Sequence, residues 1–417
     1  MINEQTSPAR SEASTAEAIS SSVEVPGGQP ARLMSLDAYR GFVMLLMISA
    51  GLGATKVAAN FKDNAVWQFV AYHTGHADWR GCSLWDLIQP SFMFIVGVAL
   101  PYSLAVRRAQ GRPFEKLFAQ ALWRSFLLVA LGVFLASTGA KMTTFSFAIV
   151  LAQIGLGYPF LWFLAWTRRR TQGLAAAVIL VGCWAAFVLY PVAPADFHYE
   201  AVGVPANWTF LQGFEAHWQK NANFATAFDQ WFLNLFPQEK RFIFNAGGYQ
   251  TLNFVPSLAT MLMGLIAGGI LKSDRSSGAK FRWLVFAGTA ALALGALWDW
   301  SGTCPMVKRI WTPSFAIFSA GWALLLLALF YSLIELRGGY RRWAFPFVVA
   351  GMNSIALYCM SMLMKPWIRE RMKLHFGQGI FDSFGAAFTP MVEAVTVILI
   401  LWLIAWWMFR RKIFLRL

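Results

Sequence analysis

The chain has 417 residues, of which 58% are apolar and only 13% are charged, against roughly 45–50% and 25% in soluble globular proteins. A surplus of apolar side chains on this scale, with 37 Phe and 20 Trp, excludes a soluble enzyme, a collagen-like chain, a disulfide-stabilised secreted domain and a disordered protein. The composition predicts an integral membrane protein that crosses the lipid bilayer many times.

The formal net charge of +15 comes from 35 Lys and Arg against 20 Asp and Glu. These basic residues stand in small groups between apolar segments, which is typical of loops beside an anionic lipid leaflet. We therefore expect no nucleic-acid partner. The four cysteines show no metal-binding spacing, so we expect no metal site, and a disulfide between Cys82 and Cys304 stays open.

Residues 1–30 are rich in Ser, Ala, Glu and Pro, so we expect a disordered N-terminal tail. Residues 31–417 are expected to form one transmembrane domain with a long extracytoplasmic loop at about 193–251. Backbone amides in hydrocarbon must be satisfied within their own segment, which predicts an all-α polytopic fold of about ten transmembrane helices. The ten apolar segments lie at about 36–54, 84–106, 119–137, 145–166, 172–192, 252–271, 283–300, 313–335, 345–367 and 389–409.

The basic residues between these segments predict the orientation. With the N-terminus in the cytoplasm, the inner segments hold 20 Lys and Arg and the outer ones hold 13. Positive charge favours the cytoplasmic side, and an even number of helices places both termini there.

The densest polar segment of the chain lies just before the second span. It contains two of the five histidines, His73 and His76, and the carboxylates of Asp78 and Asp86. A histidine at the mouth of a cavity can accept and return a proton near neutral pH, so His76 is a candidate general base. The alternative is an interfacial histidine bonded to a helix end.

Asp86 also has two interpretations. Ser83 and Asp86 have the spacing of a capping box, in which the carboxylate would bond the backbone at the start of the second span. Alternatively, Asp86 orients a catalytic histidine, and both interpretations stay open.

Three further polar residues are candidates for binding an anionic ligand. Arg40 is spaced three residues after Asp37, so it can form a structural ion pair or bind a nucleotide phosphate. Asn353 and Ser354, within the ninth span, can bond across helices or line a cavity. The sequence shows no phosphate-binding loop, dinucleotide fingerprint, nucleophile elbow or zinc-protease motif, which leaves group transfer or transport.

Two motifs resemble the heparan-alpha-glucosaminide N-acetyltransferase family of transmembrane acyltransferases. They are residues 35–41 (SLDAYRG) and residues 76–81 (HADWRG), the latter followed by 84–97 (LWDLIQPSFMFIVG). Residues 311–315 (WTPSF) and 346–354 (PFVVAGMNS) agree, so the resemblance runs from about residue 33 to about 365.

The resemblance implies that an acetyl group moves from cytoplasmic acetyl-CoA to an amino sugar or glycan on the far side of the membrane, with His76 at the position of the family's catalytic histidine. Asp86 is the expected orienter, and Arg40, Asn353 and Ser354 are the expected acetyl-CoA-binding residues. Transfer through an acetyl-imidazole on His76 and direct transfer are both open. The expected location is the cytoplasmic membrane of a bacterium, and a homodimer is open.

Two rival classes remain. A transporter of an amino sugar such as N-acetylglucosamine would move the sugar without changing it. A structural membrane scaffold would bind no acetyl-CoA.

Overall fold

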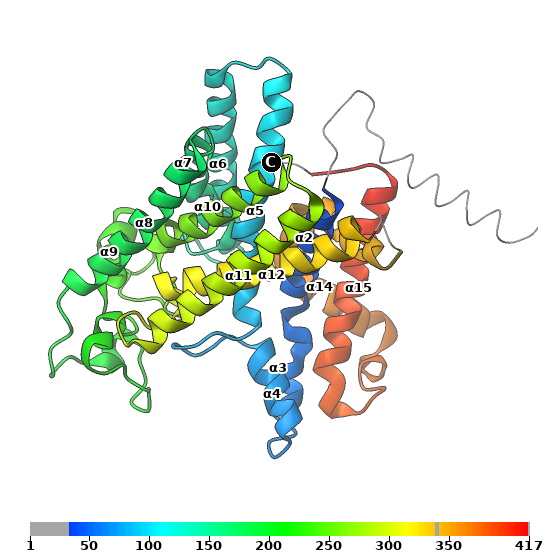
Figure 1. The fold of residues 1–417 in the computed structure, drawn as a ribbon. Coiled ribbons are helices and arrows are strands. Elements are labelled where there is room, and N and C mark those ends of the chain that lie inside the picture. Colours follow the sequence, from blue (N-terminus) through cyan, green and yellow to red (C-terminus); the bar gives the residue numbers. More distant parts are fainter. Residues whose placement is uncertain (1–32, 338–341, 416–417) are drawn as a thin grey trace, which may run out of the picture.

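The computed structural model describes residues 33–337 and 342–415. In these two ranges the regular secondary structure is helical, with two isolated bridges that join Arg80 and Gly81 to Val307 (Figure 1). The predicted all-α polytopic fold is confirmed. The tail expected at residues 1–30 lies outside the described residues.

The α-helices are α2 (Met34–Ser49), α3 (Ala54–Ala58), α4 (Ala65–Thr74), α5 (Ile88–Ala109), α6 (Phe114–Ala136), α7 (Val150–Leu164), α8 (Arg169–Leu189), α9 (Phe224–Phe232), α10 (Phe254–Leu271), α11 (Ser277–Trp300), α12 (Pro313–Tyr331), α13 (Phe345–Met352), α14 (Ser354–Phe376) and α15 (Thr389–Arg410). Short helical turns are η1 (Ala50–Gly53), η2 (Trp85–Leu87), η3 (Tyr199–Val202), η4 (Gly213–Trp218), η5 (Leu233–Leu235), η6 (Thr251–Asn253), η7 (Lys308–Ile310), η8 (Ser332–Leu336), η9 (Arg342–Ala344), η10 (Gln378–Ile380) and η11 (Ala386–Phe388).

Eight helical segments of the described chain are long and apolar enough to cross a bilayer, and a bent pair makes a ninth. The expected number was ten. The difference lies in the segment expected at 145–166, where only Val150–Leu164 is helical. At 1.5 Å per residue this helix is about 22 Å long, shorter than the roughly 30 Å hydrocarbon core.

The bent pair joins η9 and α13 to α14, with an angle of 71° between the two parts. The break falls at Asn353, whose backbone leaves the helical region at φ −120° and ψ 34°. The segment predicted as one span at 345–367 is therefore a broken helix.

Burial divides the spans into inner and outer helices. About 61–72% of the most apolar window is buried in the spans containing α5, α10 and α12, against 17–22% for α6, α8, α11 and α15. The inner pair α5 and α10 approach closely because small residues face each other. A Cβ atom on Gly97 would overlap the Met261 carbonyl oxygen, and one on Gly264 would overlap the Phe94 carbonyl oxygen. The rigid α5 carries Asp86 just before its first turn.

The long segment expected as a loop at 193–251 folds into a cap with its own helix, α9. The cap shares a small apolar core with both neighbouring connections, since Trp79 and Val307 pack in one cluster with Trp218. The Trp79 indole also donates a hydrogen bond to the Trp218 carbonyl oxygen at 2.9 Å. Residues from three distant parts of the sequence thus meet beside the start of α5. Whether this side is extracytoplasmic stays a prediction.

Candidate active site

His76 is placed by the turn that joins α4 to α5. Helix α4 ends at Gly75, and the Ser83 hydroxyl donates to the Gly75 carbonyl oxygen at 2.6 Å. Ser83 and Asp86 form the predicted capping box, because the Ser83 amide donates to Asp86 Oδ2 at 3.0 Å and the Asp86 amide donates to Ser83 Oγ at 3.3 Å. These bonds close the loop and bring the imidazole over the carboxylate.

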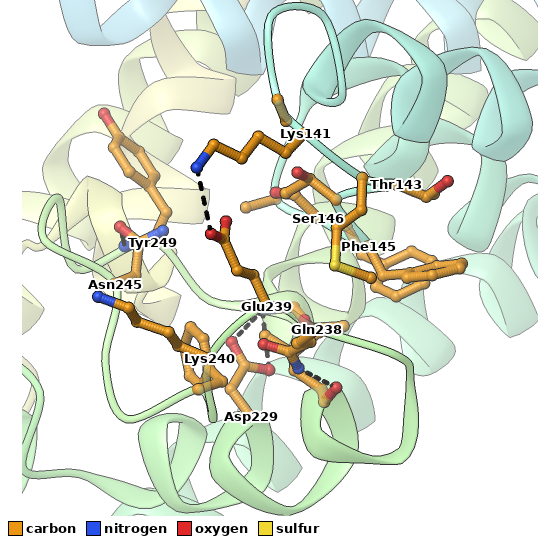
Figure 2. A pocket seen from close by; sticks show the side chains of 18 residues that line it. Lys141, Thr143, Phe145, Ser146, Asp229, Gln238, Glu239, Lys240, Asn245 and Tyr249 are labelled. Atoms are coloured by element: carbon orange, nitrogen blue, oxygen red, sulfur yellow. Dashed lines mark hydrogen bonds and ion pairs between the residues drawn. The ribbon is translucent and has the colours of Figure 1, made fainter.

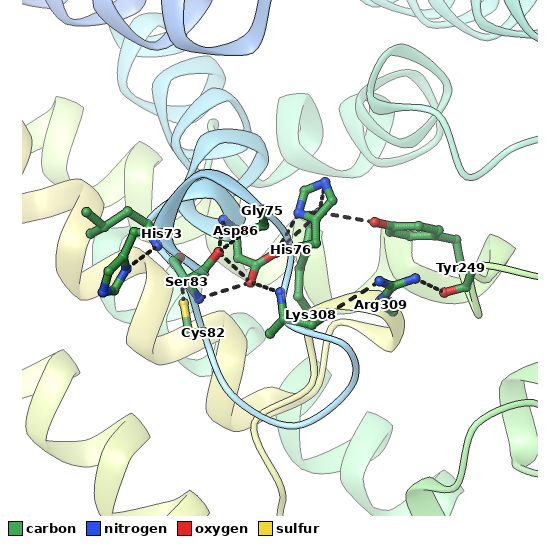
Figure 3. A network of polar contacts seen from close by, with 12 residues as sticks. His73, Gly75, His76, Cys82, Ser83, Asp86, Tyr249, Lys308 and Arg309 are labelled. Carbon is green, nitrogen blue, oxygen red and sulfur yellow. Dashed lines mark hydrogen bonds and ion pairs between the residues drawn. The ribbon is translucent and has the colours of Figure 1, made fainter. Parts of the chain in front are cut away.

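The Asp86 carboxylate makes the contacts that both open interpretations require. Its Oδ2 atom accepts hydrogen bonds from the Ser83 amide and from the Ala77 amide at 3.1 Å, while its Oδ1 atom lies 2.7 Å from His76 Nδ1. Asp86 is fully buried, whereas 37% of the His76 side chain is exposed. A rigid, buried carboxylate therefore orients an imidazole that a substrate can reach (Figure 3).

Lys308 is a third member of this cluster, and the sequence reasoning missed it. Its ammonium lies 3.1 Å from His76 Nδ1, 3.5 Å from His76 Nε2 and 3.7 Å from Asp86 Oδ1. It is only 6% exposed. In the sequence this lysine is one of the basic residues counted for membrane orientation, and no motif identifies it as a site residue.

The backbone around Lys308 is held in an unusual conformation. The turn η7 ends at Trp311, a buried non-glycine residue with φ 48°, in the left-handed region that side chains rarely adopt. The amide of Gly81 bonds the Met306 carbonyl oxygen at 2.8 Å, which fixes the His76 loop beside this turn. The Lys308 ammonium is thus positioned by the strained turn η7 and by the backbone hydrogen bond between Gly81 and Met306.

The distances define which nitrogen of His76 is available. The 2.7 Å contact with Asp86 requires Nδ1 to carry its proton as the donor, so Lys308 acts on Nδ1 as a nearby charge. Nε2 then carries the lone pair. A lone pair on Nε2, with the Lys308 ammonium 3.5 Å away, is what a general base at this position needs.

Tyr249 joins this cluster to a cavity. Its hydroxyl accepts a hydrogen bond from Lys308 at 3.3 Å, and Arg309 lies over its ring at 5.4 Å from the centroid. Tyr249 also lines a cavity of about 320 Å³ between residues 140–148 and the cap, and the buried carboxylate of Asp229 lines it too (Figure 2).

Arg80 connects the His76 loop to the cap and to the end of α11. Its guanidinium lies 2.8 Å from Glu215 Oε2 and 3.2 Å from Asp299 Oδ1. Burial raises the pKa of Glu215 above its usual value, although the Arg80 charge opposes this shift. Through its two ion pairs, Arg80 links the His76 loop to the cap and to α11.

The structure does not bring the residues predicted to bind acetyl-CoA next to His76. Arg40 lies in α2, nine residues before the helix ends at Ser49, and just beyond that end Gly51 packs against Thr74 near the His76 loop. Nine helical residues rise about 14 Å. Arg40 Nη1 lies 3.0 Å from Asp37 Oδ1, which is the ion pair the spacing allowed.

Asn353 and Ser354 lie at the break between α13 and α14. The Asn353 side chain is fully buried, where it donates to the Ile413 carbonyl oxygen at 3.1 Å and accepts from the Leu415 amide at 3.3 Å. Helix α13 packs on α2, and a Cβ atom on Gly351 would overlap the Asp37 carbonyl oxygen. The three residues therefore belong to one neighbourhood around the start of α2.

Cys82 and Cys304 are both free thiols. The open question of a disulfide between them is answered in the negative for this structure.

Comparison with known proteins supports the resemblance inferred from the motifs. The chain is 24% identical to "Heparan-alpha-glucosaminide N-acetyltransferase" of Homo sapiens and 23% identical to the protein of the same name from Mus musculus. Each alignment covers 92% of this chain but only 60% of the relative, so the chain spans about three fifths of the length of these proteins. No family model matches the chain. The resemblance predicted from the motifs is confirmed: the chain is similar to the heparan-alpha-glucosaminide N-acetyltransferases along nearly its whole length.

Proposed function

We propose that this protein is a membrane acetyltransferase that moves an acetyl group from acetyl-CoA to an amino sugar or glycan. The observation that carries the proposal is the buried Asp86 carboxylate 2.7 Å from Nδ1 of a half-exposed histidine. The similarity to two proteins named as N-acetyltransferases supports the reaction class.

In the proposed reaction His76 Nε2 removes a proton from the acceptor amine as its nitrogen attacks the thioester carbonyl carbon. The carbonyl oxygen becomes negatively charged, and the Lys308 ammonium, 3.5 Å from Nε2, is the adjacent positive charge that stabilises it. The carbon–sulfur bond then breaks, and the imidazolium returns its proton to the departing CoA thiolate. General-base assistance of this kind contributes about 10²–10⁴ in rate.

For the donor, we propose that the phosphates of acetyl-CoA bind near Arg40 and Ser354. Arginine suits this role because its guanidinium is planar and permanently charged. The Asn353 amide holds residues 413 and 415, so we propose that it shapes this neighbourhood. Since Arg40 lies about 14 Å from the end of α2 that approaches the His76 loop, the donor would bind in an extended form. This arrangement suits a donor on the cytoplasmic side and an acceptor on the far side of a bacterial cytoplasmic membrane.

The deciding experiment measures CoA thiol release and acetylated product with purified protein, acetyl-CoA and a panel of amino sugars. We expect His76→Ala to lower turnover by about 10²–10⁴. His73→Ala is the matched control, because His73 lies in the same segment but bonds only the Leu84 amide among its hydrogen-bond contacts in the described chain. A folded His76→Ala variant with full turnover would remove the assignment.

A carrier for an amino sugar is the second candidate. The 71° break at Asn353 favours it, because broken helices line substrate paths in many transporters. Protein in vesicles would then move labelled sugar without changing its mass and without releasing thiol.

A further inference from the structure

The cavity beside Tyr249 is built from a connection and the cap. Residues 140–148, which have no regular secondary structure, form one wall, and residues from 229 to 251 form the other. Its volume of about 320 Å³ is at the lower end of the range for small-ligand sites, which is about 300–1,000 Å³. The space is therefore sufficient for a sugar unit.

The lining combines flat aromatic rings with hydroxyl and amide groups. Phe145, Phe242 and Tyr249 provide rings, while Ser146 and Asn245 provide polar groups. Apolar walls with a few directed polar groups are the usual composition of a small-molecule site. Rings and polar groups together match a sugar, which has apolar C–H faces and a rim of hydroxyl groups.

Asp229 is the buried carboxylate of the cavity. Its side chain is 1% exposed, its two oxygens share the Thr251 amide at distances of 3.0 and 3.3 Å, and the Thr251 side chain also bonds it. An ionised carboxylate offers about four acceptor positions, so Thr251 fills only part of its capacity. Burial raises the pKa of Asp229 to about 6, which indicates that its charge is poorly compensated.

The charged side chains around Asp229 do not fill this role. Lys141 and Glu239 also line the cavity and pair with each other at 3.8 Å, with 86% and 60% of their side chains exposed (Figure 2). Their pair lies in solvent, whereas the Asp229 carboxylate is buried. Lys240, the other charged lining residue, is exposed too, and no ion pair joins it to Asp229 in the described part of the chain. A ligand that carries hydroxyl or ammonium donors would therefore be the complement of Asp229.

The cavity adjoins the proposed active site at one residue. Tyr249 lines the cavity, and its hydroxyl accepts a hydrogen bond from the same Lys308 ammonium that contacts His76. A ligand in the cavity and a ligand at His76 would lie on either side of Tyr249, as two linked sugar units would.

We propose that the cavity binds the sugar unit next to the one that is acetylated, with Asp229 accepting hydrogen bonds from its hydroxyl or ammonium groups. The identity of the acceptor as a saccharide rests on the proposed function. Binding itself requires neither acetyl-CoA nor turnover.

The test measures binding of a glucosamine disaccharide to purified protein in detergent by calorimetry, without acetyl-CoA. We expect Asp229→Asn to weaken binding about tenfold or more, because it loses hydrogen bonds to a charged group. Asp196→Asn is the matched control, since Asp196 is an exposed carboxylate in the same segment. The asparagine at 229 can still accept the Thr251 bond, so the fold should be retained.

A second variant blocks the space without touching Asp229. Thr143 is an exposed lining residue, and Thr143→Trp should also abolish disaccharide binding. Binding is measured without acetyl-CoA and without turnover, which separates this proposal from the proposed chemistry. Acetyl transfer to the disaccharide with unchanged binding in both cavity variants would overturn the proposal. Loss of binding in both variants would support it even if no acetyl transfer were found.

Discussion

The charges of Asp86 and Lys308 should be coupled in both stability and catalysis. Asp86→Asn keeps the shape of the side chain and its ability to accept the Ser83 and Ala77 amide bonds, but it removes the negative charge. Lys308, which is 6% exposed, then keeps a buried ammonium without its carboxylate partner 3.7 Å away.

The expected cost follows from this burial. Removing one partner of a buried ion pair costs on the order of 3–5 kcal/mol, because the remaining charge is desolvated and uncompensated. The Nδ1 proton of His76 also loses the acceptor at 2.7 Å that fixes its tautomer. Loss of this orientation should lower kcat by about 10²–10⁴.

The double variant Asp86→Asn with Lys308→Met separates the two effects. Because it removes both charges, it should recover most of the lost stability, while kcat stays low because His76 remains without its carboxylate. Melting followed by tryptophan fluorescence in detergent reports the stability, and thiol release reports the rate. Asp78→Asn, an exposed carboxylate of the same loop, is the control and should change neither.

Two results would refute this reasoning. If the destabilisation of the double variant equals the sum of the two single variants, Asp86 and Lys308 are not energetically coupled. If Lys308→Met retains the wild-type kcat, the ammonium does not stabilise the charge that develops on the thioester oxygen.

Three further outcomes are expected. Burial raises the pKa of Asp229 to about 6, so the folded protein holds this proton more tightly than the unfolded chain does, and the stability of the wild type falls as the pH rises from about 4 to about 6. Over this range the melting temperature of Asp229→Asn should rise relative to that of the wild type. A constant difference between the two melting temperatures would contradict this expectation. Burial raises the pKa of Cys82 to about 12 and that of Cys304 to about 11, so both thiols should resist maleimide at neutral pH and react on denaturation, as mass spectrometry can show; a disulfide found there would be the opposing result. Arg40→Gln should raise the KM for acetyl-CoA about tenfold if it binds phosphate, whereas Asp37→Asn should not, and equal effects would indicate a purely structural ion pair.

The sequence predicted where the helices lie better than it predicted where they end or break. Apolar runs identify helices in a membrane because hydrocarbon leaves the backbone no other partner. The same rule fails where the run meets protein instead of lipid, as at residues 145–149, which are not helical and lie in or beside the cavity wall. It also fails to show the break at Asn353, whose amide is satisfied by residues 413 and 415, sixty residues away in sequence.

In the site, too, contacts between residues close in sequence could be predicted, whereas contacts between residues far apart in sequence could not. The bonds among His76, Ser83 and Asp86 lie within eleven residues. The spacing of Ser83 and Asp86 predicted the capping box, and a contact of Asp86 with a histidine was the open alternative. Lys308 is 232 residues from His76, and its place depends on the shared core that joins the cap to both connections. In the sequence, a lysine in a short connection counts only toward the prediction of membrane orientation. Only the fold shows that the ammonium of this lysine is buried. The double variant described above therefore tests the part of the site that depends on tertiary structure, while His76→Ala tests the part that the sequence could predict.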